Sequence, residues 1–278
     1  MRSSSLALFG SALVVLVTAS GCRIEAHTQT QFEDSTQPAK TSVQDWAGQA
    51  ITITNDGVNP LSGTGGIEVT TSPTATKITA SAVFAAHADD DKKADADATI
   101  KDLLGTFVIE ESANGITVKC GHGNAHGTSN AAGSGCKIIR VTIPAGSATQ
   151  PLDLTIGGGN GDIHLSGDET TVTKLLVSNN GIGDVTVKTK TVPGATLDIH
   201  GDGAVAVALP ADFSTQAVDI RVDEADPAKA AARLHSEFTD FNSGSPYPAS
   251  GATPTAIMKL TVQSTGPFDS DTITISKF

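Results

Sequence analysis

Short segments in which every second residue is hydrophobic begin near Trp46 and recur along most of the chain. The first of them are Ile51-Thr52-Ile53, Ile67-Glu68-Val69, Phe107-Val108-Ile109, Ile116-Thr117-Val118 and Ile139-Arg140-Val141-Thr142-Ile143. Side chains alternate between the two faces of a strand, so a period of two indicates one buried and one exposed face. These segments therefore predict half-buried β-strands.

The alternation becomes regular in the middle of the chain. Apolar pairs separated by one residue begin at Leu152, Ile163, Leu175, Val185, Leu197, Val205 and Val218, and every second pair returns after about 22 residues. The turns recur as Gly159-Asn160-Gly161-Asp162, Gly181-Ile182-Gly183-Asp184 and Gly201-Asp202-Gly203-Ala204. We interpret these glycines as corner residues with positive φ. We expect Asp162 and Asp184 to cap their corners by accepting hydrogen bonds from local backbone N–H groups.

Two strands and one recurring corner in each repeat predict an all-β fold of the β-solenoid type, or β-helix, with coils of about 22 residues. Each coil would hydrogen-bond to the next about 4.8 Å away and stack its inward Val, Leu and Ile side chains on those of its neighbours. The alternative is an antiparallel β-sandwich, whose strands also recur every 8 to 12 residues or so. We favour the solenoid because a sandwich has no need to repeat its corner chemistry.

Two segments depart from the strand pattern and predict short helical excursions. Residues 89–104 are charged and rich in alanine, with Ala96, Ile100, Leu103 and Leu104 at helical spacing. Further along, Asp226-Pro227 supplies a cap and a proline at the first helical position, ahead of residues 228–238. We expect both helices to pack over the strands or to cover an open edge.

The first 22 residues are typical of an exported lipoprotein. Arg2 supplies the positive charge of a signal peptide, and Leu6 to Val17 form a hydrophobic region that is too short to span a membrane. The run Ala19-Ser20-Gly21-Cys22 resembles the lipobox of bacterial lipoproteins. The resemblance implies cleavage after residue 21 and a diacylglycerol thioether, with acyl chains such as palmitate, on Cys22. Two or three acyl chains hold a protein on a membrane, whereas one binds marginally.

The residues after Cys22 lead to the expected location and domain boundaries. Arg23 stands where an aspartate would resemble the inner-membrane retention signal, so we expect the outer membrane, on its periplasmic or surface face. Residues 22–45 are rich in Thr, Gln and Ser and lack a hydrophobic period, which predicts a lipidated cysteine followed by a flexible tether. Residues 46–278 would then form the β domain.

Composition and charge narrow the classes of partner. The chain of 278 residues has a formal net charge of −12 and only 4% aromatic residues. Nucleic acids are bound through clusters of Lys and Arg, and no such cluster occurs in the sequence. We therefore expect no nucleic-acid partner, and no sequence motif indicates a cofactor.

A pair of cysteines encloses a glycine-rich loop. Cys120 and Cys136 remain once Cys22 carries lipid, and an even pair in an exported protein predicts a disulfide at the base of a hairpin. The alternative is a tetrahedral zinc site, because His122 and His126 lie in the same loop. We favour the disulfide, which leaves the two histidines as weak metal candidates and predicts no dedicated metal site.

Catalytic motifs are absent from the sequence. Asp89-Asp90-Asp91 lies in the charged excursion, and no Ser, His and Asp set occurs at a motif spacing. The Gly-Asp corners do not follow the nine-residue period of calcium-binding β-rolls. His164 and His200 alternate with inward apolar residues, so we expect them to face solvent. A carbohydrate-active β-helix enzyme stays open as an alternative if folding brings carboxylates together in a groove.

The second half of the chain resembles a known family. Residues 152–222, with Gly-Asn-Gly-Asp-Ile, Gly-Ile-Gly-Asp-Val and the later run from Val207 to Phe213, are similar to the bacterial adhesin-like family of repetitive β-solenoid domains of unassigned function. The resemblance implies a surface role and brings no catalytic residues. We therefore expect a non-enzymatic, lipid-anchored scaffold or binding module whose partner is a polysaccharide or a surface protein. The alternatives are the carbohydrate-active enzyme and a metal-binding envelope protein.

Overall fold

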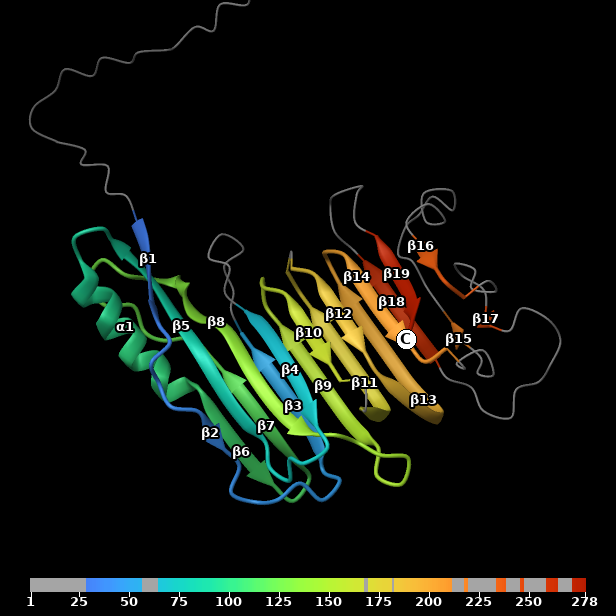
Figure 1. The fold of residues 1–278 in the computed structure, drawn as a ribbon. Coiled ribbons are helices and arrows are strands. Elements are labelled where there is room, and N and C mark those ends of the chain that lie inside the picture. The colour runs from blue at the N-terminus through green and yellow to red at the C-terminus, as the bar shows by residue number, and fades with distance from the viewer. Residues whose placement is uncertain are drawn as a thin grey trace, which may run out of the picture.

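The computed structural model describes residues 29–56, 65–167, 170–181, 183–211, 218–219, 234–238, 246–247, 259–264 and 272–278. These residues form two large β-sheets, a two-stranded sheet and one helix (Figure 1). The predicted signal peptide, the predicted lipidation of Cys22 and the predicted helix at residues 226–233 lie outside the described residues. No helix within the described residues is long and apolar enough to cross a membrane.

Sheet A has 10 strands and sheet B has 7. Sheet A contains, in spatial order, β1 (Gln29–Asp34), β5 (Thr79–Asp89), β8 (Asn130–Pro144), β4 (Gly66–Ser72), β10 (Ile163–Ser166), β12 (Val185–Lys188), β14 (Val205–Leu209), β19 (Ile273–Lys277) and β16 (Leu234–Ser236), with β2 (Lys40–Thr41) on β5. Sheet B contains β18 (Lys259–Ser264), β13 (Lys190–Gly201), β11 (Thr171–Asn179), β9 (Leu152–Gly158), β3 (Ala50–Asn55), β7 (Gly115–Cys120) and β6 (Val108–Ser112). The small sheet pairs β15 (Val218–Asp219) with β17 (Pro246–Tyr247).

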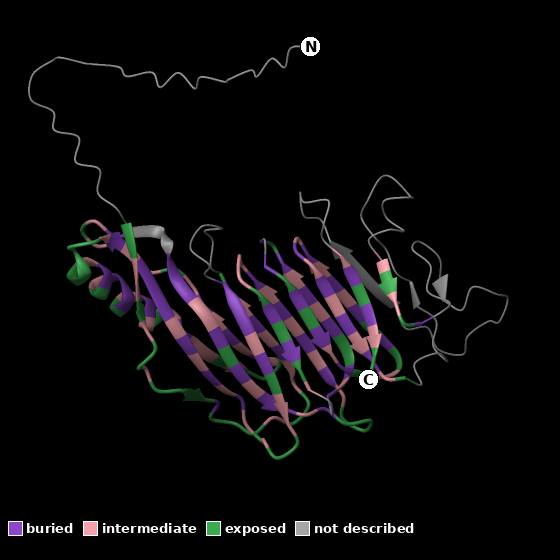
Figure 2. Cartoon of the chain, turned by 45° about the horizontal axis from the view of Figure 1, so that its top comes forward, coloured by how far each residue is buried: buried purple, intermediate pink, exposed green. Residues whose placement is uncertain are grey.

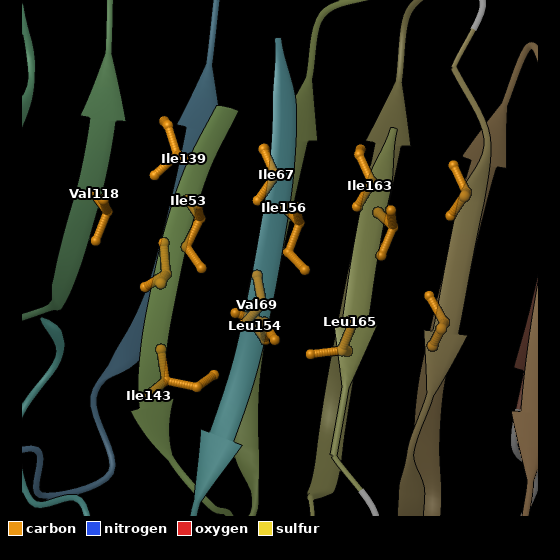
Figure 3. Packing of buried hydrophobic residues seen from close by; sticks show 14 of the residues in the cluster. Ile53, Ile67, Val69, Val118, Ile139, Ile143, Leu154, Ile156, Ile163 and Leu165 are labelled. Atoms are coloured by element: carbon orange, nitrogen blue, oxygen red, sulfur yellow. The ribbon is translucent and has the colours of Figure 1, made fainter. Parts of the chain in front are cut away.

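The core lies between the two large sheets. The central strands of both large sheets bury every second side chain, as the alternating colours along them show (Figure 2). Strand pairing aligns these inward residues in rows, such as Ile139, Ile67, Ile163, Val185, Val205 and Ile273 in sheet A. Side chains from both sheets fill the space between them (Figure 3). Complete burial of each Val, Leu or Ile contributes about 1.5–3 kcal/mol, so these rows are the main stabilising feature.

The repeat of the sequence appears as the register of parallel neighbours. Ile163 pairs with Val185, and Val185 pairs in turn with Val205. In sheet B, Leu175 pairs with Leu197. Successive strands from β9 to β14 alternate between the sheets, so each apolar pair meets the pair that lies two strands later in the chain.

The prediction of a β-solenoid is wrong. A solenoid places each coil beside the preceding one, but β9 pairs with β3 and β10 pairs with β4. Strands β3 and β4 therefore separate the repeats from β7 and β8. Antiparallel strands β1, β5 and β6 are added at one end. The result is two open, mixed sheets in a sandwich-like arrangement. The alternative, an antiparallel β-sandwich, predicted the two layers correctly. It predicted the strand direction wrongly, because the strand pairs in the middle of both sheets, such as β10 with β12 and β11 with β13, are parallel.

The predicted helices had different outcomes. The first is confirmed as α1 (Lys93–Thr106), which buries Ala96, Thr99, Ile100 and Leu103 and contacts β5 and β8. The C-terminal end of the second prediction is wrong, because Leu234–Ser236 form strand β16 beside β19. Backbone hydrogen bonding to a neighbouring strand overrides a helical pattern of only a few residues.

The folded part begins earlier than residue 46. Residues 29–45 were expected to belong to the tether, yet β1 pairs along its length with β5 and β2 pairs with the other end of β5. Thr and Gln are tolerated in this edge strand because only part of its surface contacts the core. Any tether between Cys22 and the fold is therefore shorter than the sequence indicated.

Candidate functional site

The corners of the repeat are joined to one another by their aspartates. The carboxylate of Asp162 accepts a hydrogen bond of 2.9 Å from the backbone N–H of Asp184, and Asp184 accepts one of 2.9 Å from Ala204. Each aspartate therefore bonds the next corner of the stack, where the sequence led us to expect a bond within its own corner. The recurring Gly-Asp motif serves the contact between repeats and needs no calcium ion.

The corner glycines are required by close backbone contact. A Cβ atom on Gly183 would lie 2.3 Å from the carbonyl oxygen of Gly161, and one on Gly203 would lie 2.7 Å from that of Gly183. Among the described glycines, positive φ occurs at Gly48, Gly65, Gly127 and Gly194, so our interpretation of positive φ at these corners is wrong. Stacked corners leave no room for a side chain.

Two buried asparagines tie the sheets together beside these corners. Asn179 donates from Nδ2 to the carbonyls of Gly161 and Gly183, at 3.1 and 2.8 Å. Asn55 donates in the same way to Gly66 and Cys136, at 2.9 and 3.1 Å. The carbonyls at the corners are thereby satisfied inside the protein, as buried polar groups require.

The predicted disulfide between Cys120 and Cys136 is present, with the Cα atoms 6.2 Å apart and both residues fully buried. It does not close a hairpin, because β7 lies in sheet B and β8 lies in sheet A. The bond therefore links the two layers near α1. The sulfur atoms are consumed in this bond and offer no thiolate to a metal.

The loop between these cysteines is fastened to α1 by a polar stripe on the helix. Asp95 accepts hydrogen bonds from the backbone N–H and hydroxyl of Thr128, at 2.8 and 2.9 Å. One turn later, Thr99 accepts a bond of 3.1 Å from the backbone N–H of His126. A further turn on, Asp102 lies 2.8 Å from the His126 ring. The loop is therefore positioned as a structural element.

The two histidines of the loop lie in different surroundings. His126 contacts Asp102, while His122 lines a separate hollow at the end of β3 and β9, beside Asp56 and Asn160. Within the described residues, no group of three or more His, Cys, Asp or Glu side chains could hold a metal ion. His164 is exposed beside Asp162, and His200 is partly exposed with its ring 2.8 Å from Asp198.

Acid is expected to release the loop from α1. The hydrogen bonds from Thr128 hold the pKa of Asp95 below its usual value. Because the folded pKa is the lower one, the stabilising effect is complete above about pH 4 and is lost as the pH falls through the folded pKa. We expect amide exchange at Thr128, followed by NMR, to accelerate below pH 4 relative to exchange in the core strands.

Two variants on α1 test this expectation. Asp95→Asn should give fast exchange at Thr128 already at pH 6. Asp97→Asn is the matched control, because Asp97 lies on the exposed side of the same helix and pairs only with Lys93 within the described residues. Equal exchange at Thr128 in both variants at every pH would contradict the assigned role of Asp95.

A hollow of about 460 Å³ opens on the outer face of sheet A, where β1, β5, β8 and β4 meet the corner before β10. This volume lies in the range of small-ligand sites. The strands that form it are rigidly paired, so the side chains around the hollow have a fixed spacing. We call it the charged hollow, because ionisable side chains line it.

Two cations, one histidine and three carboxylates surround the charged hollow. Their pairs are Lys137 with Glu33 at 2.7 Å, Arg140 with Glu68 at 2.8 Å, and His164 with Asp162 at 4.0 Å. All six side chains are roughly half exposed. Exposed ion pairs contribute only about 0–1 kcal/mol, so stability alone does not account for this arrangement.

A β-bulge shapes one side of the charged hollow. Val83 pairs with Ile138 and Phe84 pairs with Cys136, which leaves Lys137 without a partner in β5. The extra residue allows both Lys137 and Ile138 to line the hollow, while Ile139 is fully buried in the core. Bulges often redirect side chains beside binding sites.

The sequence did not indicate this site. Its residues come from positions 33 to 164 and meet only through the pairing of β4 with both β8 and β10. One signal was available, because the adjacent residues Ile138 and Ile139 break the strict alternation of β8. The groups that the hollow presents are charged and hydrogen-bonding groups suited to a polar ligand.

Comparisons with known proteins support the architecture. No protein-family model matches the chain, and no curated protein matches it. A solved crystal structure of a candidate cell adhesion protein from Clostridium sporogenes is similar, with a TM-score of 0.51 and 10% sequence identity. The alignment covers 87% of this chain and 99% of that protein. At this identity the similarity shows a shared fold.

Proposed function

We propose that this chain is a non-enzymatic, lipid-anchored protein of the cell envelope that acts as an adhesin-like binding module. The charged hollow carries the proposal, because a sheet of paired strands that presents a polar depression suits recognition of a polar surface ligand. The shared fold with a candidate cell adhesion protein supports it. The buried disulfide fits an exported protein, since such bonds persist in oxidising compartments.

The ligand is proposed to be a polysaccharide. The test uses the full chain in detergent micelles on an array of bacterial and host polysaccharides. Ile138→Trp should fill the charged hollow and weaken binding at least about tenfold. Leu176→Trp is the matched control, because Leu176 is a half-buried aliphatic residue on the outer face of sheet B. Equal loss of binding in both variants, or the absence of any bound polysaccharide, would contradict the proposal.

A carbohydrate-active enzyme is the second candidate, favoured by one observation. Glu33, Glu68 and Asp162 all border the charged hollow, and glycoside hydrolysis uses paired carboxylates. Incubation of the bound polysaccharide with the protein separates the two functions. A binding module leaves the number of reducing ends unchanged, whereas cleavage that is abolished by Glu68→Gln would establish the enzyme.

Membrane attachment through Cys22 is part of the proposal and has its own test. Cys22→Ala should abolish incorporation of labelled palmitate, because the thioether has no other attachment point. Arg23→Ala is the control and should retain the label. Labelled Cys22→Ala protein would disprove the anchor, and fractionation of the wild type tests the expected outer-membrane location.

A further inference from the structure

We infer that the charged hollow selects an acidic saccharide and that Arg140 binds its carboxylate. This inference rests on the proposed binding function and adds the chemical class of the ligand.

The guanidinium of Arg140 has donors available for a ligand. Its Nε donates to Glu68 at 2.8 Å, and within the part of the chain that the structure describes no other polar contact of this side chain occurs. The terminal amino groups of arginine form a planar fork that matches the two oxygens of a carboxylate. Glu68 therefore fixes the side chain and leaves this fork for the ligand.

The groups beside Arg140 are suited to the hydroxyls of a sugar. Strand pairing places Arg140, Glu68 and His164 next to one another on β8, β4 and β10. Asp162 and Asn160 border the same hollow. Carboxylate and amide oxygens accept hydrogen bonds from hydroxyl groups, while Lys137, turned toward the hollow by the bulge, adds a second cation near the ligand carboxylate.

The lining also distinguishes this hollow from sites for neutral sugars or peptides. Among its described lining residues there is no Trp, Tyr or Phe on which a sugar ring could stack, and only Val83 and Ile138 are large apolar residues. Recognition therefore depends on polar groups and on charge. A saccharide with a carboxylate satisfies the cations and the acceptors together.

The decisive experiment compares two forms of one ligand. The full chain in micelles is titrated with an oligomer of uronic acid and with the same oligomer after chemical reduction of its carboxyls to alcohols. We expect the acidic form to bind at least about tenfold more tightly, because reduction removes the partner of the arginine fork. Arg140→Gln should lose about ten- to hundred-fold in affinity for the acidic form and should remove the preference.

Two further variants make the result specific. Arg140→Lys keeps the charge but lacks the planar fork, so we expect it to recover only part of the preference. Lys174→Gln is the matched control on sheet B, because Lys174 pairs with Asp153 and is 51% exposed, against 52% for Arg140. This control should bind the acidic oligomer as the wild type does.

The outcomes separate this inference from the proposed function. Equal binding of acidic and reduced oligomers that is lost in Ile138→Trp would overturn the selection of acidic sugars and leave the binding function in place. A preference that survives Arg140→Gln would overturn the role of Arg140. Failure of the wild type to bind any saccharide on the array or in solution would overturn both proposals.

Discussion

Alanine at Gly183 is expected to lower the free energy of unfolding by about 2–3 kcal/mol. The new Cβ would lie 2.3 Å from the carbonyl oxygen of Gly161 and 2.8 Å from the backbone nitrogen of Asp162. Both atoms belong to a backbone that is held in place by strand pairing, so the corners must move apart. Denaturant unfolding at neutral pH, followed by circular dichroism, measures the change.

Gly105→Ala is the control for this prediction. Gly105 lies near the end of α1, where an added Cβ would meet no atom within 4 Å. Alanine has a higher helix propensity than glycine, so this variant should be as stable as the wild type or up to about 1 kcal/mol more stable. If Gly183→Ala and Gly105→Ala unfold at the same denaturant concentration, the proposed contact between stacked corners is incorrect.

Removal of the disulfide is expected to cost about 3 kcal/mol of stability. The double variant Cys120→Ala with Cys136→Ala loses a link between β7 in sheet B and β8 in sheet A, across a sequence separation of 16 residues. The unfolded chain gains conformational freedom, and the native sheets lose a covalent connection. The midpoint of denaturant unfolding is the measurement.

Reduction of the wild type gives an independent check. Both cysteines are fully buried, so a reductant at neutral pH should act slowly until denaturant opens the structure. The reduced wild type should then unfold close to the midpoint of the double variant. A double variant as stable as the oxidised wild type would show that the bond contributes nothing to the fold.

The sequence predicted the strands much better than their neighbours. Alternation such as Ile51-Thr52-Ile53 reflects a local property of the backbone, namely that successive side chains point to opposite faces. The partner of a strand is a non-local property. Pairing of β3 with β9 joins residues about 100 positions apart, and no pattern within the repeat indicated that β3 and β4 would lie beside it.

The candidate site also combines features that depend on local sequence with features that depend on strand pairing. The expectation of export and the even number of remaining cysteines were sufficient to predict the bond between Cys120 and Cys136, because disulfides persist in oxidising compartments. The charged hollow required the order of β8, β4 and β10 in space, together with the bulge at Lys137. Arg140 and Glu68 had been noted only as the polar positions of two strands.

The bonds between aspartates and the following corners have a consequence for the length of the protein. The carboxylates of Asp162 and Asp184 each bond the backbone N–H of the following corner, whereas the third corner ends in Ala204 and offers no such acceptor. A duplicated or deleted unit of about 22 residues that ends in such an aspartate would therefore meet matching partners on both sides. Gene duplication could lengthen the parallel part of this protein without new chemistry at the junctions. The charged hollow would then lie further from the C-terminal strands.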